Sequence, residues 1–357
     1  MNKTDLHDRK IKLIIMNINP NKLFQYVCKN GHLKDAQHIL EVHPTIDISD
    51  DNECAFRVAC AYGHLQVAQW LYELKLTLDI SAKNEYAFRG ACAYGHMQVA
   101  QWLYQSKPTL DVSAENECAF RWACAKGHLE VAQWLYQSKP TLDISAINEF
   151  AFIYACQHGH LEVAQWLYQI KPTINILAED EFAFRTACEK EHLEVAQWLY
   201  EIKPTINISA NNEWAFRYAC CYGHLEVAQW LYRVKPTLDI SAYNEEAFEI
   251  ACQKGHLLLA QWIQSLNPNK YVILHVENNH IKYIILQTLN KSKPILYKEQ
   301  IDICPICSET MCNLQTACNH TFCESCIQTW FNSNQGQTCP YCRTCLSNTV
   351  FQPIATH

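Results

Sequence analysis

The chain has 357 residues, of which 49% are apolar and 18% are charged. This composition is that of a globular protein rather than a disordered one, and the length has room for two or three domains. The formal net charge of −7 provides no general electrostatic reason to bind nucleic acid, so we expect no nucleic-acid partner.

The N-terminal region contains no segment that predicts export. Its apolar run at 11–16 is shorter than the hydrophobic part of a signal peptide, and no stretch has the length needed to cross a bilayer. Twenty cysteines without an export signal indicate a reducing compartment. We therefore expect a soluble intracellular protein with no membrane partner, whose residues 1–19 form a mobile or capping N-terminal segment.

Between about residues 20 and 270 the chain repeats itself with a period of 32 residues. The unit reads N-E-x-A-F-R-x-A-C-x-x-G-H-L-E-V-A-Q-W-L-Y-x-x-K-P-T-L-D-I-S-A-x. Full copies begin at Asn52, Asn84, Asn116, Asn148, Asp180, Asn212 and Asn244, and a degenerate copy surrounds Cys28 and Gly31, making eight. A fixed period of this size is the signature of a solenoid of stacked units.

Each unit carries the pattern of two short helices. In the first full copy, apolar residues at 55–60 recur at the three- and four-residue spacing of one helix face. Gly63 supplies a left-handed turn that ends this helix, and a second helix is expected at about 65–74. A Lys-Pro-Thr segment ends the second helix in the following copies, because proline cannot continue it.

This order of helix, Gly-His turn, helix and loop resembles the ankyrin repeat, and G-H-L-E-V at 127–131 is a close match to the start of its second helix. The resemblance covers about 70% of the chain and implies a β-hairpin finger between units and a protein-binding role. Cys54-Ala55-Phe56-Arg57 replaces the ankyrin T-P-L-H, the loop lacks the usual Gly-Ala, and the unit is one residue short. The variant is similar to the ankyrin arrays of giant DNA viruses of amoebae (mimivirus-like), which implies the cytoplasm of an infected host cell.

Three residue types recur in the copies and are explained by packing of the stack. We expect the cysteine column to be small buried core, the histidine column to cap or bridge the Gly-His turn, and the tryptophan column to pack between repeats. A tryptophan ladder that stacks bases is the alternative for the last column.

Positions that differ between copies are more informative, because the stack does not dictate them. Counted from the Asn of each unit, the third, the seventh and the eleventh slot (just before the Gly-His turn) are rich in aromatic residues, which suits a binding surface; drift is the alternative. The candidates for binding a protein substrate are Tyr86, Trp122, Phe150, Tyr154, Phe182, Trp214 and Tyr218. Glu191 replaces one turn glycine and predicts a strained or altered turn that bends the array.

Residues 271–300 match neither the repeat nor the segment that follows. The apolar runs at 271–274 and 281–286 predict a last helix pair that caps the solenoid, and 291–294 predicts a linker.

The segment 304–343 has seven cysteines and one histidine at metal-ligand spacing: Cys304-x2-Cys307, Cys318-x-His320, Cys323-x2-Cys326 and Cys339-x2-Cys342. Zinc accepts four thiolates, or three thiolates and one imidazole, so eight ligands make two closed structural sites. A disulfide cluster of a secreted domain is the alternative. Cys312 and Cys345 lie outside the set and are interpreted as ordinary thiols.

The order C-C-C-H-C-C-C-C resembles the RING finger of C3HC4 type over 301–346. The resemblance implies interleaved sites: Cys304, Cys307, Cys323 and Cys326 hold the first Zn2+ and Cys318, His320, Cys339 and Cys342 the second. In ubiquitin-ligase members an apolar patch binds the ubiquitin-conjugating enzyme (E2), and its positions here are Ile306, Trp330 and Pro340. Arg343 matches the basic residue that bridges E2 and ubiquitin, where a planar guanidinium suits the contact.

Together these patterns predict a mainly α protein. An ankyrin-type helical-repeat solenoid at 20–270 is followed by capping helices and a linker at 271–300. A small two-zinc α+β RING domain at 301–346 and a C-terminal tail at 347–357 complete the chain. The function implied is that of a RING-type E3 ubiquitin ligase, which holds a ubiquitin thioester near a lysine of a substrate bound to the array. A non-catalytic scaffold that uses both modules for protein interaction is the alternative.

Overall fold

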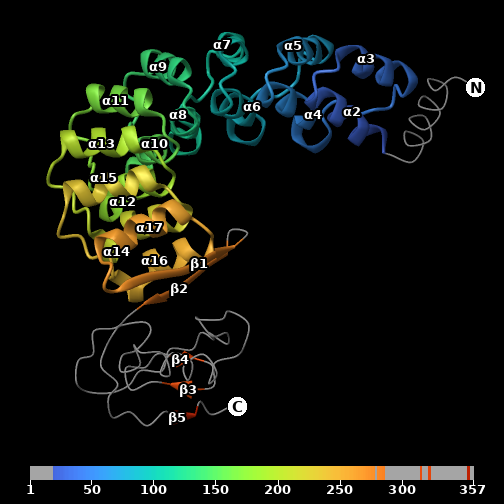
Figure 1. Ribbon diagram of the computed structural model, residues 1–357. Helices are drawn as coiled ribbons and strands as arrows, with labels where there is room; N and C mark the ends of the chain where they lie inside the picture. Colours follow the sequence, from blue (N-terminus) through green and yellow to red (C-terminus); the bar gives the residue numbers. More distant parts are fainter. Residues whose placement is uncertain (1–18, 278–279, 286–313, 316–320, 323–351, 354–357) are drawn as a thin grey trace, which may run out of the picture. The chain divides into compact units, whose positions relative to one another are not determined.

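The computed structural model describes residues 19–277, 280–285, 314–315, 321–322 and 352–353 (Figure 1). The chain divides into two units, Met1–Ala260 and Gln261–His357. The described residues contain sixteen helices, which form pairs in a repeat packing, so the predicted helical solenoid is confirmed.

The helices alternate between the first and the second member of each pair. The first helices are α2 (Pro20–Lys29), α4 (Asp50–Ala61), α6 (Ala82–Ala93), α8 (Ala114–Ala125), α10 (Ala146–Gln157), α12 (Ala178–Glu189), α14 (Ala210–Tyr222) and α16 (Ala242–Gln253). The second helices are α3 (Leu33–Val42), α5 (Leu65–Leu74), α7 (Met97–Ser106), α9 (Leu129–Ser138), α11 (Leu161–Ile170), α13 (Leu193–Ile202), α15 (Leu225–Val234) and α17 (Leu257–Leu266). Each first helix from α2 to α14 packs on the next first helix and on its own second helix.

The core of the array is built by columns of identical residues. The phenylalanine of each unit is buried, and its ring meets the tryptophan of the next unit, as in Phe56 and Trp102 at 6.2 Å between centroids. Tyr72 contacts the same tryptophan edge-on from the second helix. The column cysteines are fully buried, and burial raises the pKa of the Cys28 thiol to about 12. The tryptophan and cysteine columns therefore serve the stack, as predicted.

The Gly-His turns join neighbouring units. Gly95 has φ +78°, which glycine adopts without strain, and a Cβ at this position would lie 2.6 Å from Nδ1 of His128 in the next unit. In the same arrangement, Nε2–H of His64 donates to the carbonyl oxygen of Lys29 in the preceding unit, at 2.9 Å. The histidine thus bridges repeats, and the glycine is needed both for its φ and for the close approach of the ring.

The turn at Glu191 keeps this geometry with a residue that does not favour it. Glu191 has φ +68°, in the left-handed region. Its carboxylate lies 3.3 Å from Nδ1 of His224, whose Nε2 donates to the carbonyl oxygen of Glu189. The strain that the sequence predicts is therefore present, while the turn itself is retained.

Each first helix from α4 to α16 has three left-handed residues in its first turn, a feature that the sequence pattern did not reveal. In α4 these are Asp51, Asn52 and Glu53, with φ between 53° and 62°. The guanidinium of Arg57 donates from Nε to the carbonyl oxygen of Asn52 (2.7 Å) and from Nη2 to that of Asp51 (2.8 Å). Left-handed residues other than glycine each cost about 1–2 kcal/mol, so the repeated arginine holds a strained turn.

The segments between units contain turns, and no strand occurs between residues 19 and 270, so the expected β-hairpin finger is wrong. Between α5 and α6, the N–H of Leu78 donates to the carbonyl oxygen of Lys75 and that of Ala82 to Asp79. The N–H of Ser81 donates to the side chain of Asp79 at 2.9 Å. These local bonds satisfy the backbone groups that a hairpin would pair.

The predicted capping helices at 271–285 are also wrong, because this segment forms strands β1 (Tyr271–Glu277) and β2 (His280–Ile285). They pair antiparallel with Tyr271 opposite Ile285 and Glu277 opposite His280. The segment is rich in Val, Ile and Tyr, which favour strands, and its apolar runs are too short to identify a helix by periodicity. Three further two-residue strands, β3 (Leu314–Gln315), β4 (Thr321–Phe322) and β5 (Gln352–Pro353), form an antiparallel sheet in the order β4-β3-β5.

Candidate functional site

The seven aromatic residues predicted to bind substrate lie on the first helices, and five of them form two clusters. In the α8–α10 cluster, Trp122 meets Phe150 edge-on at 5.4 Å, and Phe150 stacks on Tyr154 at 4.1 Å between centroids. In the α14 cluster, Trp214 stacks on Tyr218 at 4.4 Å. The clusters are only partly accessible, because Trp122 is exposed while their other rings are half-buried.

The third-slot rings also pack against the arginine that clamps the preceding unit. Arg57 lies 5.0 Å from the ring centroid of the exposed Tyr86, and Arg185 lies 4.9 Å from that of Trp214. Phe182 lies beside Arg185 of its own unit at 5.5 Å. Some of the aromatic residues at this slot therefore stabilise the stack. The sequence alone did not distinguish this structural role from a binding role.

A row of lysines and tyrosines runs along the C-terminal ends of the first helices and was not among the predicted substrate residues. We call it the lysine–tyrosine strip; its members are Lys29, Tyr62, Tyr94, Lys126, His158, Lys190, Tyr222 and Lys254. Apart from Lys29, all occupy the eleventh slot, whose variation between copies already indicated a binding surface. Tyr62, Tyr94 and Tyr222 are exposed by 43%, 48% and 45%.

Within the strip, cations lie over aromatic rings of neighbouring units. Tyr62 and Tyr94 stack at 5.9 Å, with Lys29 Nζ 4.7 Å from the first ring centroid and Lys126 Nζ 3.8 Å from the second. Lys190 and Lys254 lie over Tyr222 at 5.4 and 5.0 Å. Such contacts contribute about 0.5–1 kcal/mol at exposed sites and hold the ammonium groups at the surface.

Most of these lysines have no carboxylate partner within the described ranges. Lys190 is the exception: it bonds Glu189 at 2.9 Å, and this hydrogen bond raises the pKa of Lys190. In residues 19–277, Lys29, Lys126 and Lys254 form no ion pair, although Lys254 Nζ lies 3.3 Å from Cys221 Sγ. The strip therefore presents positive charge that the fold leaves available.

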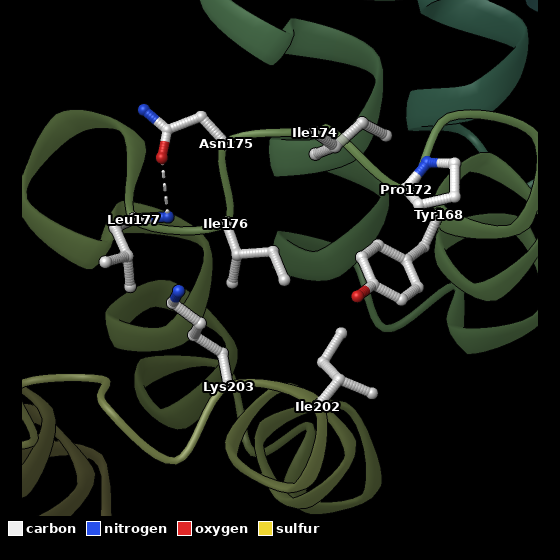
Figure 2. Close-up of a pocket in the computed structure, with 8 residues that line it drawn as sticks. All are labelled: Tyr168, Pro172, Ile174, Asn175, Ile176, Leu177, Ile202 and Lys203. Atoms are coloured by element: carbon white, nitrogen blue, oxygen red, sulfur yellow. Dashed lines mark hydrogen bonds between the residues drawn. The ribbon is translucent and has the colours of Figure 1, made fainter.

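A separate pocket of about 210 Å³ opens where one unit departs from the consensus (Figure 2). In three other units a lysine donates to the serine Oγ located 26 residues earlier, as Lys171 does to Ser145, and that serine donates to a glutamate. The residue 26 positions before Lys203 is Leu177, so this lysine loses its partner. It lines the pocket with Tyr168, Pro172, Ile174, Asn175, Ile176, Leu177 and Ile202.

The described residues contain neither a metal-binding cluster nor a membrane-spanning helix. Among them no group of three or more His, Cys, Asp and Glu side chains is placed to hold a metal ion. No described helix has both the length and the apolar character to span a bilayer.

The predicted zinc ligands and E2 contacts lie outside the described residues. These are Cys304, Ile306, Cys307, Cys318, His320, Cys323, Cys326, Trp330, Cys339, Pro340, Cys342 and Arg343, together with Cys312 and Cys345. The described strands bracket part of the set: β3 pairs with β4 through Gln315 and Thr321, and Cys318 and His320 stand in the five residues that connect them. Thiolates and imidazole are zinc ligands, so the donor set fits this ion.

Comparison with known proteins identifies the two kinds of module. The family described as zinc finger, C3HC4 type (RING finger), matches residues 304–342, and the family described as ankyrin repeats (many copies) matches residues 120–167. The chain carries both modules. RING finger domains bind zinc, and the repeat and RING assignments predicted from the sequence are confirmed at this level.

Curated relatives match over the RING region only. The chain is 42% identical over 60 residues to E3 ubiquitin-protein ligase RNFT1 of Danio rerio, which is 16% of this chain and 14% of that protein. It is 44% identical over 50 residues to the Homo sapiens protein of the same name, or 14% of this chain and 11% of that protein. The Xenopus tropicalis protein matches at 47% over 47 residues, 13% and 11% of the two chains. The chain thus spans about a seventh or less of the length of these relatives.

Proposed function

We propose that the protein is a RING-type E3 ubiquitin ligase whose ankyrin array binds the substrate. The observation that carries the proposal is the C3HC4 match at 304–342 together with the similarity of this region to proteins named E3 ubiquitin-protein ligases. An array of repeats beside such a module supports recruitment of a protein substrate, because stacked repeats offer an extended surface.

The ligase would act by positioning. Ile306, Trp330 and Pro340 are assigned to the E2-binding patch, and Arg343 to the contact that bridges E2 and ubiquitin. A thioester held beside an acceptor lysine reacts in an effectively unimolecular step, which is the source of the rate gain. The acceptor is a lysine of the substrate protein, and the substrate is bound to the array. No residue of this chain acts as the nucleophile.

The metal would be structural. We assign one Zn2+ to Cys304, Cys307, Cys323 and Cys326 and a second to Cys318, His320, Cys339 and Cys342. When bound, two such ions replace the apolar core that a domain of this size lacks. Because all eight ligands are accounted for, no coordination position remains for water.

The test is autoubiquitination by the full chain with ubiquitin, activating enzyme, ATP and a panel of E2 enzymes. We expect ubiquitin ladders from the wild-type chain, none from Ile306→Ala/Arg343→Ala, and unchanged ladders from Arg233→Ala, an exposed residue of α15. Zinc content of each protein is measured in parallel. Absence of ladders with every E2, from protein that holds two zinc ions per chain, would refute the ligase and leave the non-catalytic scaffold.

The proposal also covers the origin of the protein and its location in the cell. The N-E-x-A-F-R variant and its Ile-, Asn- and Lys-rich context support a viral, mimivirus-like origin. The same resemblance supports a location in the cytoplasm of an infected cell, where E2 enzymes of the host would serve the protein. Growth of ladders with E2 enzymes of an amoeba is the measurement that bears on this point.

A further inference from the structure

The lysine–tyrosine strip is positively charged in a chain whose formal net charge is −7. Its four lysines stand on α2, α8, α12 and α16 or directly after these helices. The carboxylates near it are already engaged: Glu189 with Lys190, and Glu191 with His224. The strip therefore attracts an anionic partner more strongly than the rest of the surface of the array does.

These lysines differ from the cations that the fold uses. The column arginines donate to carbonyl oxygens of the left-handed turns, as Arg121 does to Asn116 at 2.6 Å. Lys75 and Lys235 donate to serines of the preceding unit. By contrast, among the described residues Lys29 and Lys126 contact ring faces and form no ion pair; Lys29 is exposed and Lys126 half-buried. Such a charge contributes little to the stability of the array and remains free for a partner.

The strip continues into the two aromatic clusters. Lys126 lies 5.9 Å from the ring of Trp122 in the α8–α10 cluster, and Tyr222 lies 6.3 Å from Tyr218 in the α14 cluster. Two helix-to-helix steps separate α10 from α14, which is about 16–20 Å at usual packing distances. An extended chain covers this span with about five or six residues.

We propose that the strip and the two clusters bind an acidic segment of polypeptide that carries two apolar side chains about five or six residues apart. The apolar side chains pack on the α8–α10 and α14 clusters, and the Asp or Glu residues face Lys126 and Lys254. The inference rests on the proposed function only in taking this segment to be part of the ubiquitination substrate.

A polypeptide fits these features better than an oligonucleotide. Base stacking needs open ring faces, but Phe150 and Tyr154, like Trp214 and Tyr218, already stack on each other. Four lysines spread over eight units are also sparse for a backbone that carries one charge per nucleotide. The ring edges of the two clusters are partly accessible and lie beside lysines, and such a surface can bind the apolar and acidic side chains of a polypeptide.

The test selects peptides from a random 14-residue display library on the full chain. Selection is repeated on Lys126→Gln/Lys254→Gln and on a control that removes the same charge from exposed positions of the second helices, Lys34→Gln/Arg233→Gln. We expect Asp and Glu to be enriched, with two apolar positions five or six apart, on the wild-type chain and the control but not on the strip variant. The most enriched peptide is then synthesised with a fluorescent label, and its Kd is measured by anisotropy.

The strip variant should weaken this peptide about three- to tenfold, and the control less than twofold. Raising salt from 0.05 to about 0.5 M should weaken wild-type binding and narrow the difference between variants. Trp122→Ala should weaken the peptide without changing its salt dependence.

Enrichment of basic or neutral peptides, equal loss in the control, or no enrichment would overturn the inference. Tighter binding of a labelled 14-nucleotide single strand with the same dependence on Lys126 and Lys254 would do so too. Because peptide binding needs neither E2 nor ubiquitin, its outcome is independent of the autoubiquitination result. Binding without ladders would remove the ligase and retain the acidic partner.

Discussion

The Gly-His turns make a quantitative prediction about the stack. In Gly95→Ala the alanine must adopt φ +78°, and its Cβ would lie 2.6 Å from Nδ1 of His128. Left-handed alanine costs about 1–2 kcal/mol. Displacing the ring breaks its hydrogen bond to the backbone of Ala93, worth about 1 kcal/mol. The lower entropy of the unfolded alanine chain returns about 0.5–1 kcal/mol. We expect a net loss of about 2 kcal/mol in the free energy of unfolding.

The assay is urea unfolding of the full chain followed by circular dichroism at 222 nm, with Gln98→Ala, an exposed position of α7, as control. The control should stay within about 0.5 kcal/mol of wild type. In a His128→Ala background the ring contact is absent, so Gly95→Ala should cost about 1 kcal/mol less than in wild type. An equal cost in both backgrounds would refute the close-approach argument and leave backbone strain as the reason for the glycine.

Three further predictions follow. Burial lowers the pKa of the bridging histidines, and neighbouring His or Lys charges add to it; these residues are His96, His128, His160 and His192. The folded state therefore prefers neutral rings. Their contribution to stability is full above the unfolded pKa of about 6.5 and is lost as the pH falls below it toward the lowered pKa values of the folded state. Urea unfolding midpoints at pH 7.5 and 5.5 test this, and a higher midpoint at pH 5.5 would contradict it. Removal of zinc with a chelator should abolish ubiquitin ladders while leaving most helical circular dichroism, because the described helices hold no metal cluster; loss of the helical signal would contradict this. Leu177→Ser should supply the hydroxyl that accepts from Lys203 and donates to Glu181, and should raise the free energy of unfolding by about 0.5–1 kcal/mol, measured by thermal unfolding. The control Leu177→Ala supplies no hydroxyl and should show no such gain.

The helix pairs were predictable because one repeated unit displays its packing constraints eight times. Apolar spacing fixed the two helices, and Gly63 marked the turn between them. The strict period of the histidines predicted a structural role, capping or bridging the Gly-His turn, and the structure shows that the ring bridges neighbouring units. What the period does not reveal is which atoms meet, so the hydrogen bond from His64 to the Lys29 carbonyl oxygen required the structure.

The errors have a common physical origin in segments whose partners are not periodic. At 271–285, short apolar runs were assigned to helices, although β-branched content favours the observed hairpin. The loop between units was expected to pair as a finger, but the Asp79 side chain and nearby carbonyl groups take its N–H groups. The left-handed first turn of the helices α4 to α16 was not predicted, because the arginine that bonds its carbonyl groups, Arg57 in α4, reveals these partners only in the structure.

The arginine column also shows how structural and functional charge can be separated in such arrays. The arginine of this column, present in five of the eight units, is directed to carbonyl oxygens of its own unit, as Arg57 is, and cannot distinguish one partner from another. By contrast, Lys126 contacts ring faces and bonds no carbonyl oxygen among the described residues. Replacing it changes the surface at one place and leaves the repeat contacts intact. In the proposed complex, the selectivity of the array would therefore reside in the third, seventh and eleventh slots, and the unpaired lysines of the eleventh slot would favour a negatively charged partner.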